Sequence, residues 1–149
     1  MPDNSITVVG NMTRDPELKF LNSGQAAVRL SIAVNRRWQN RQSGEWEERV
    51  SYFEVTGYGA LAENAANSLS KGTRVVVTGR LEQRSWETEN GEKRSVVEIN
   101  ADEIAPSLRF ATAVVTRTPR PDAPARDVER AASPRPHDPT PYTFDEEPF

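Results

Sequence analysis

The residue types that most often carry catalysis are nearly missing from this sequence. It contains no cysteine, which excludes thiolate nucleophiles, disulfides and cysteine-ligated metals. Its single histidine, His137, lies among prolines, where it cannot join a pre-organised site, and no phosphate-binding glycine loop is present. The carboxylate pairs Glu47-Glu48 and Asp102-Glu103 could hold a nuclease metal, but adjacent residues of a strand point to opposite faces. We therefore predict no enzyme, no cofactor and no metal site.

Aromatic residues offer a different chemistry, because their spacing predicts which of them are exposed. If Phe53 and Val55 point into a β-barrel, Tyr52 and Tyr58 point away from it. In a later strand the inward set is Val75, Val77 and Leu81. That parity turns Trp86 outward, beside arginines. Trp38 likewise follows two arginines at the end of an apolar strand.

Outward aromatic rings beside guanidinium groups suit a ligand that has both flat bases and phosphates. Bases stack on any π surface and contribute on the order of 1–3 kcal/mol each, while cations follow the phosphates. The predicted stacking residues are Trp38, Tyr52, Tyr58 and Trp86. The predicted phosphate contacts are Arg36, Arg37, Arg41, Arg49, Lys71, Arg74, Arg80 and Arg84. Two alternatives stay open: outward aromatics also form cross-strand pairs or dimer interfaces, and each cation can be a solvated charge paired with a glutamate.

The elements that must position these residues are mostly strands. Apolar residues recur at every second position in five segments, which predicts strands over 6–11, 28–34, 49–58, 74–86 and 94–104. A three- and four-residue spacing predicts one helix over 60–69. Turn residues at 42–45 and 89–92 predict two long hairpin arms, and Trp46 could brace the first. This mainly β order predicts an OB fold, a five-stranded partly open barrel with one helix.

Net charge does not support a nucleic-acid partner by itself. The formal charge is -3, and the first 110 residues carry 14 Lys and Arg against 15 Asp and Glu. Binding must therefore depend on where the positive side chains lie relative to the aromatic ones. An OB-type RNA-binding or primosome-like module remains an alternative, since nothing in these residues distinguishes DNA from RNA.

Proline usage marks a change of organisation towards the C-terminus. Eight of the eleven prolines lie from Pro119 onward. We predict an OB-fold binding and oligomerisation domain over 1–116, a proline-rich disordered linker over 117–141 and an acidic tip over 142–149. The chain shows neither an apolar run long enough to span a bilayer nor a signal peptide. We therefore expect a soluble cytoplasmic protein with no membrane partner.

Several motifs together carry a resemblance to a known family. They are Ile6-Thr7-Val8-Val9-Gly10-Asn11, Asp15-Pro16-Glu17, Ala33-Val34-Asn35-Arg36-Arg37-Trp38, Lys71-Gly72-Thr73-Arg74-Val75 and Gly79-Arg80-Leu81 leading to Trp86. With these motifs the whole chain resembles the bacterial single-stranded DNA-binding protein family, SSB. The family's stacking aromatics fall on the four positions predicted above. The resemblance implies homotetramers that bind and protect single-stranded DNA, without sequence preference, in replication, recombination and repair, associated with the nucleoid.

The C-terminal tip takes its expected role from the same resemblance. In the family, an acidic tip that ends in Pro-Phe docks onto replication, recombination and repair proteins. The matching residues here are Asp145, Glu146, Glu147, Pro148 and Phe149.

The sequence also departs from the family pattern. Tyr52 stands where many members have tryptophan, and Glu54, Ala60 and Glu82 occupy positions that are often basic. We therefore expect lower affinity and more salt-sensitive binding. Residues 107–116 resemble an additional C-terminal strand of the actinobacterial branch that clasps paired subunits, with a frayed linker as the alternative. The short linker without glycine resembles a shorter-tailed paralogue. Ile6, Val8 and the outer residues of an open barrel edge would otherwise remain exposed, which favours self-association.

Overall fold

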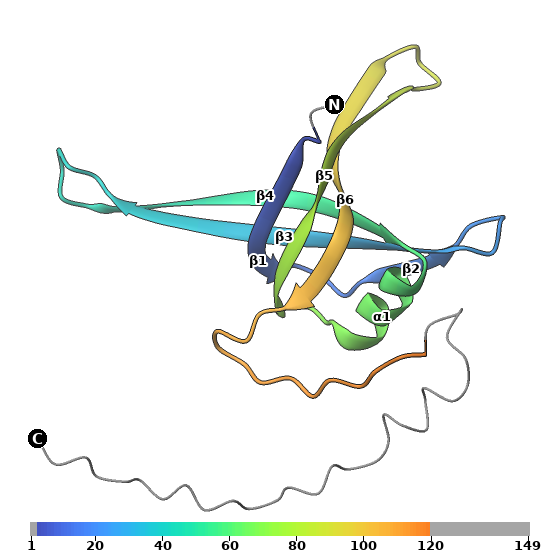
Figure 1. The fold of residues 1–149 in the computed structure, drawn as a ribbon. Coiled ribbons are helices and arrows are strands. Elements are labelled where there is room, and N and C mark those ends of the chain that lie inside the picture. Colours follow the sequence, from blue (N-terminus) through green and yellow to red (C-terminus); the bar gives the residue numbers. More distant parts are fainter. Residues whose placement is uncertain (1–2, 120–149) are drawn as a thin grey trace, which may run out of the picture. The chain divides into compact units, whose positions relative to one another are not determined.

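Six strands and one helix form the folded part of the chain, for which a computed structural model describes residues 3–119 (Figure 1). The elements in chain order are β1 (Ser5–Met12), β2 (Glu17–Phe20), β3 (Ala26–Gln39), β4 (Trp46–Tyr58), α1 (Ala60–Ser68), β5 (Arg74–Glu87) and β6 (Lys93–Pro106). The sheet order is β1-β5-β6-β4-β3-β2, and an additional pairing of β1 with β3 closes the sheet into a ring. The five predicted strands and the predicted helix are confirmed.

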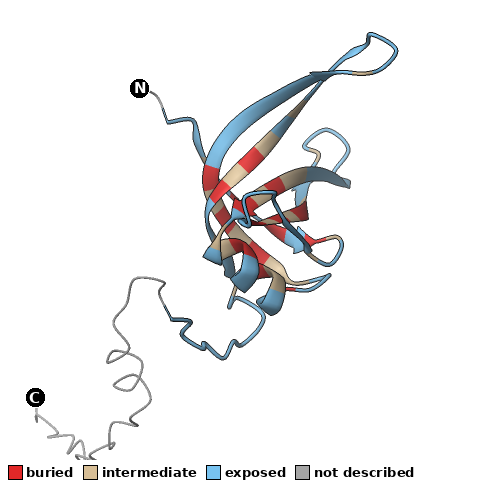
Figure 2. Ribbon diagram, turned by 90° about the vertical axis from the view of Figure 1, so that its right-hand side faces the viewer, coloured by how far each residue is buried: buried red, intermediate tan, exposed pale blue. Residues whose placement is uncertain are grey.

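The inward faces of the strands form the core, because their apolar side chains alternate with polar ones. Val28, Leu30 and Ile32 of β3 are fully buried, as is Val55 of β4. Val75 and Val77 of β5, Ile99 of β6 and two alanines of α1 join the same cluster. Figure 2 shows the buried residues gathered where the strands meet α1, and exposed residues along the β5–β6 hairpin. The predicted inward parity of β3, β4 and the first half of β5 is thus confirmed.

The second half of β5 departs from the prediction. Leu81 was expected in the core but is 39% exposed. It stands opposite the buried Ile99, so its parity is inward. However, the register shifts between Thr78 and Gly79, and beyond that irregularity the hairpin extends past the closed part of the sheet. The prediction for Leu81 was wrong because correct parity does not bury a side chain where no opposing layer exists.

One strand escaped prediction and one predicted strand is not formed. β2 has four residues, all exposed, and so lacks the alternation that reveals a strand. Residues 107–116 form no strand, so that prediction was wrong for the single chain. A strand needs a partner backbone, and the expected partner lay on another subunit. Instead, the Ser107 backbone N–H donates to the Arg74 carbonyl at 2.8 Å.

The prediction that Ile6 and Val8 are exposed and favour self-association was also wrong. Val8 is buried and Ile6 packs against the core, so both point inward from β1. The outer face of β1 presents Val9, which is exposed, and Thr7, whose hydroxyl pairs with that of Thr78 at 3.0 Å. Ile6 and Val8 therefore offer no exposed apolar surface for association, whereas Val9 on the outer face does.

The folded unit ends at Ala113, and residues 114–119 belong to a second unit and form neither helix nor strand. The predicted linker over 117–141 lies outside the described residues except for 117–119, and the tip over 142–149 lies wholly outside them. Both assignments stay predictions. The described part of the chain has no helix long and apolar enough to cross a membrane.

Candidate nucleic-acid interface

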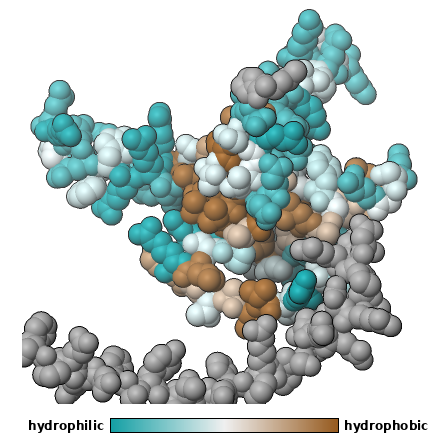
Figure 3. All heavy atoms as spheres, viewed as in Figure 1, coloured by the Kyte–Doolittle hydropathy of each residue, from teal (hydrophilic) through white to brown (hydrophobic). Residues whose placement is uncertain are grey.

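Two hairpins extend beyond the core and carry most of the predicted site residues (Figure 1). We call residues 35–50 of β3, β4 and their turn the first arm, and residues 82–98 of β5, β6 and their turn the second arm. Hydrophilic side chains cover the projecting hairpins, while apolar ones appear over the central sheet (Figure 3). The first arm has four arginines and three glutamates, whereas the second has three cations and five glutamates.

The first arm pairs each of its tryptophans with an arginine. The Arg36 guanidinium carbon lies 6.0 Å from the centroid of the Trp38 ring, and that of Arg37 lies 4.9 Å from Trp46. Arg36 and Trp38 are two residues apart and so share one face of β3. The register places Arg37 and Trp46 together on the opposite face of the arm. The two tryptophans therefore lie on different faces of the arm, and both faces present a ring and a cation. Trp46, which could brace this hairpin, is 61% exposed.

Two arginines of the first arm face each other. The register places Arg36 directly opposite Arg49, and like charges in such a pair repel. No carboxylate of the described residues forms an ion pair with either one. A phosphate between the two guanidinium groups would relieve this repulsion. Arg41 lies exposed in the turn of the same arm.

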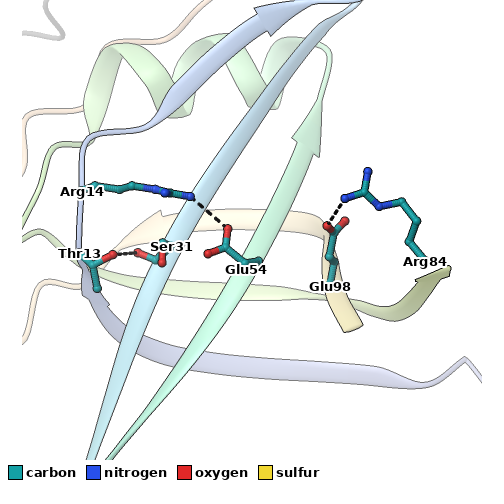
Figure 4. Close-up of polar contacts among 6 residues, drawn as sticks. All are labelled: Thr13, Arg14, Ser31, Glu54, Arg84 and Glu98. Atoms are coloured by element: carbon teal, nitrogen blue, oxygen red, sulfur yellow. Dashed lines mark hydrogen bonds and ion pairs between the residues drawn. The ribbon is translucent and has the colours of Figure 1, made fainter. Parts of the chain in front are cut away.

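The outer face of β4 holds the two predicted tyrosines. Tyr52 is 70% exposed and Tyr58 is 43% exposed, on the same face as Trp46. Between them lies Glu54, whose carboxylate accepts a hydrogen bond from Arg14 at 3.3 Å (Figure 4). The outward prediction for both tyrosines is confirmed, but a neutralised carboxylate separates them.

The second arm presents Trp86 together with Arg84, and Arg80 precedes the arm on the same face of β5. These residues share one face with Glu98 and Asn100 of β6 by register. Trp86 is 44% exposed, and the Arg84 guanidinium lies 5.4 Å from its ring centroid. The same guanidinium donates to the Glu98 carboxylate at 3.1 Å (Figure 4). Arg84 thus contacts both an aromatic ring and a carboxylate.

A groove of about 570 Å³ joins the tyrosine face to the second arm. Its lining includes Tyr58 of β4, Arg84 of β5 and Glu98 of β6. Two further cations, Lys19 and Arg29, line it and were not among the predicted contacts. The signal for Arg29 was its outward parity between Val28 and Leu30, whereas Lys19 lies in the strand that was not predicted.

Two predicted phosphate contacts lie elsewhere. Arg74 begins β5, and Trp86 lies near the other end of the same strand, at most about 40 Å away. Its guanidinium lies 5.7 Å from the Phe110 ring. Lys71 lies in the turn before β5, where its backbone N–H donates to the Asp15 carboxylate at 2.8 Å. The structure therefore does not bring Lys71 and Arg74 together with the tryptophans.

Comparison with known sequences identifies the family. The sequence model described as "Single-strand binding protein family" matches residues 3–107. The chain belongs to this family. Its SSB relatives include proteins named single-stranded DNA-binding protein from Mycobacterium leprae, 53% identical, and Corynebacterium glutamicum, 56% identical. Each alignment spans 119 residues, which is 79% of this chain and 71% and 53% of the two relatives.

A solved SSB structure has the same fold. The chain described as "Plasmodium falciparum SSB complex with ssDNA" matches with a TM-score of 0.65 and 27% identity, over 70% of this chain and 94% of the other. The OB fold and the resemblance to actinobacterial SSB proteins are thereby confirmed. Membership of SSB also confirms that the chain is a non-enzymatic protein.

Proposed function

We propose that this protein binds single-stranded DNA with little sequence preference. The observation that carries the proposal is the repeated pairing of an exposed ring with an arginine, at Trp38, Trp46 and Trp86. A strand can stack its bases on these rings and on the exposed tyrosines, because stacking does not depend on base identity. Membership of SSB and a structural relative named as a complex with ssDNA support the same conclusion.

The phosphate contacts that we propose lie on the first arm, at Arg36, Arg37, Arg41 and Arg49. Each of these side chains is exposed and forms no ion pair with the described residues. Each contact releases counterions, so log K should fall with log salt with a slope of about -0.7 per contact for a single strand. Binding by this arm should therefore weaken steeply as salt rises.

A tryptophan-fluorescence titration with oligo(dT) tests the proposal. We expect strong quenching by oligo(dT) and little response to a matched duplex, at low and at moderate salt. The absence of quenching would contradict the proposed function and leave the fold as a protein-interaction module. A stronger response to oligo(rU) than to oligo(dT) would favour the RNA-binding alternative.

We further propose that the protein acts as a homotetramer in replication, recombination and repair, in association with the nucleoid. Family membership and the exposed Val9 on the outer face of β1 support association. Light scattering coupled to size-exclusion chromatography measures the mass, and a monomer at micromolar concentration would contradict this part of the proposal.

The tip residues Asp145 to Phe149 are proposed to recruit partner proteins. Their acidic run before Pro-Phe supports this role. Deleting them should leave oligo(dT) affinity unchanged or slightly higher, because a competing anionic segment is lost, and should abolish capture of replication and repair proteins. A loss of DNA affinity in the deletion variant would contradict the separation of the two roles.

A further inference from the structure

Arg84 contacts a tryptophan ring, as Arg36 and Arg37 of the first arm do, but among these three arginines it alone also forms an ion pair within the described residues. Its guanidinium donates to Glu98 at 3.1 Å and lies 5.4 Å from the Trp86 ring centroid. The side chain of Arg84 is 59% exposed, but that of Glu98 is only 15% exposed. The ion pair therefore has one partner in water and one largely removed from it.

Repulsion from a second carboxylate favours the ion pair between Glu98 and Arg84. The register places Glu98 directly opposite Glu82, and two carboxylates so placed repel each other. Asn100 donates to Glu82 at 3.2 Å, and Arg84 neutralises Glu98. If Arg84 moved to a phosphate, Glu98 would lose the cation that neutralises it and would face the second carboxylate without compensation, which is unfavourable.

We infer that Glu98 is a positioning residue, which holds Arg84 at the Trp86 ring and prevents it from acting as a full phosphate contact. The inference rests on the proposed single-stranded DNA binding and assigns a specific role within it. The second arm then binds a base through Trp86 while Arg84 stays neutralised. Such binding releases few counterions, so it depends little on salt. Arg84 acts on DNA through the ring that it contacts.

The test measures the salt dependence of oligo(dT) binding in four proteins: the full chain, R84Q, E98Q and the double variant. We expect R84Q to leave the slope of log K against log salt nearly unchanged. E98Q should steepen it by about 0.7, because Arg84 is then free to contact one phosphate. The double variant should return to the slope of R84Q. E89Q is the matched control, since it removes the same charge from the turn of the same arm, and it should leave the slope unchanged.

Two outcomes would overturn the inference while leaving the proposed function intact. One is a slope of log K against log salt that becomes shallower by about 0.7 in R84Q, because Arg84 would then already be a full phosphate contact. The other is an unchanged slope in E98Q, provided that its circular dichroism and thermal unfolding match those of the full chain. The absence of any oligo(dT) binding by the full chain would instead overturn the proposed function.

A measurement without DNA separates positioning from binding. In a chain whose other tryptophans are replaced, W38F/W46F, the emission comes from Trp86 alone. E98Q in this background should raise quenching by acrylamide to the value given by R84Q, because the guanidinium no longer shields the ring. Unchanged quenching would show that Glu98 does not hold Arg84, and would overturn the inference whatever the DNA affinity.

Discussion

The two arms contain the same residue types, but the like charges that face each other across their strands are positive in the first arm and negative in the second. In the first arm Arg36 faces Arg49, and in the second Glu82 faces Glu98. The arginine pair has no carboxylate partner among the described residues, whereas Glu98 is neutralised by Arg84. Both like-charge pairs oppose folding of their hairpin by repulsion. An anion from outside the chain would relieve the first, whereas Arg84 relieves the second within the chain.

This difference shows why total charge is a poor guide to nucleic-acid binding. A net charge of -3 conceals one arm with an excess of cations and another with an excess of carboxylates. Affinity from phosphate contacts falls with salt, but affinity from stacking does not. A chain that has both kinds of arm should keep part of its affinity at salt concentrations that remove the phosphate contacts.

The largest effect should follow from removing the arginine pair of the first arm. Replacing Arg36 and Arg49 together by alanine should weaken oligo(dT) binding about 100-fold at low salt, since each charge-assisted contact contributes on the order of 1.5 kcal/mol. The slope against log salt should become shallower by about 1.4. Fluorescence titration at four salt concentrations measures both. Lys71→Ala is the control at a distant turn, and an equal effect there would contradict the assignment to the arm.

A smaller effect of a different kind should come from the second arm. Trp86→Ala should weaken binding about 10-fold, because one stacking platform contributes on the order of 1–3 kcal/mol, and should leave the salt slope unchanged. Trp86→Phe keeps a ring and should recover most of the affinity. Fluorescence anisotropy of a labelled oligo(dT) measures both variants. If Trp86→Ala made the salt slope shallower, as the first-arm variant should, the proposed difference between the arms in salt dependence would be contradicted.

The groove between the tyrosine face and the second arm should contribute a few-fold to affinity. Arg29 lines it with Tyr58, and Arg29→Ala should make the salt slope shallower by about 0.7 if a phosphate reaches this wall. Arg29→Lys keeps the charge and should restore the slope. The same anisotropy series measures both. Identical slopes in the full chain and both variants would show that the DNA strand lies outside the groove.

The smallest effect concerns stability rather than binding. Glu82→Gln keeps the oxygen that accepts from Asn100 but removes one of the two opposed carboxylates. The free energy of unfolding should rise by about 0.5 kcal/mol, the scale of a cross-strand pair. Urea unfolding followed by circular dichroism measures it. Glu89→Gln in the nearby turn has no opposed carboxylate in the register and should change nothing, so an equal gain there would contradict the argument from the register.

Much of the site was accessible from the sequence because exposure depends on local alternation. Tyr52, Tyr58 and Trp86 are exposed as their parity predicts, and Trp38 lies with its arginine. The prediction was weaker where a residue's surroundings, rather than its parity, decide its role. Leu81 lacks an opposing layer, and Arg74 lies at the end of β5 that is remote from Trp86.

The sequence by itself determined the strands, the helix, the core residues of β3 and β4 and the exposed aromatic rings. These features follow from periodicity and turn residues, which act over a few positions. Only the tertiary structure decided which charges face each other and which walls form the groove. Arg36 and Arg49 are 13 positions apart and Glu82 and Glu98 are 16 apart. Their opposition depends on the register between strands, which packing and the turns fix together.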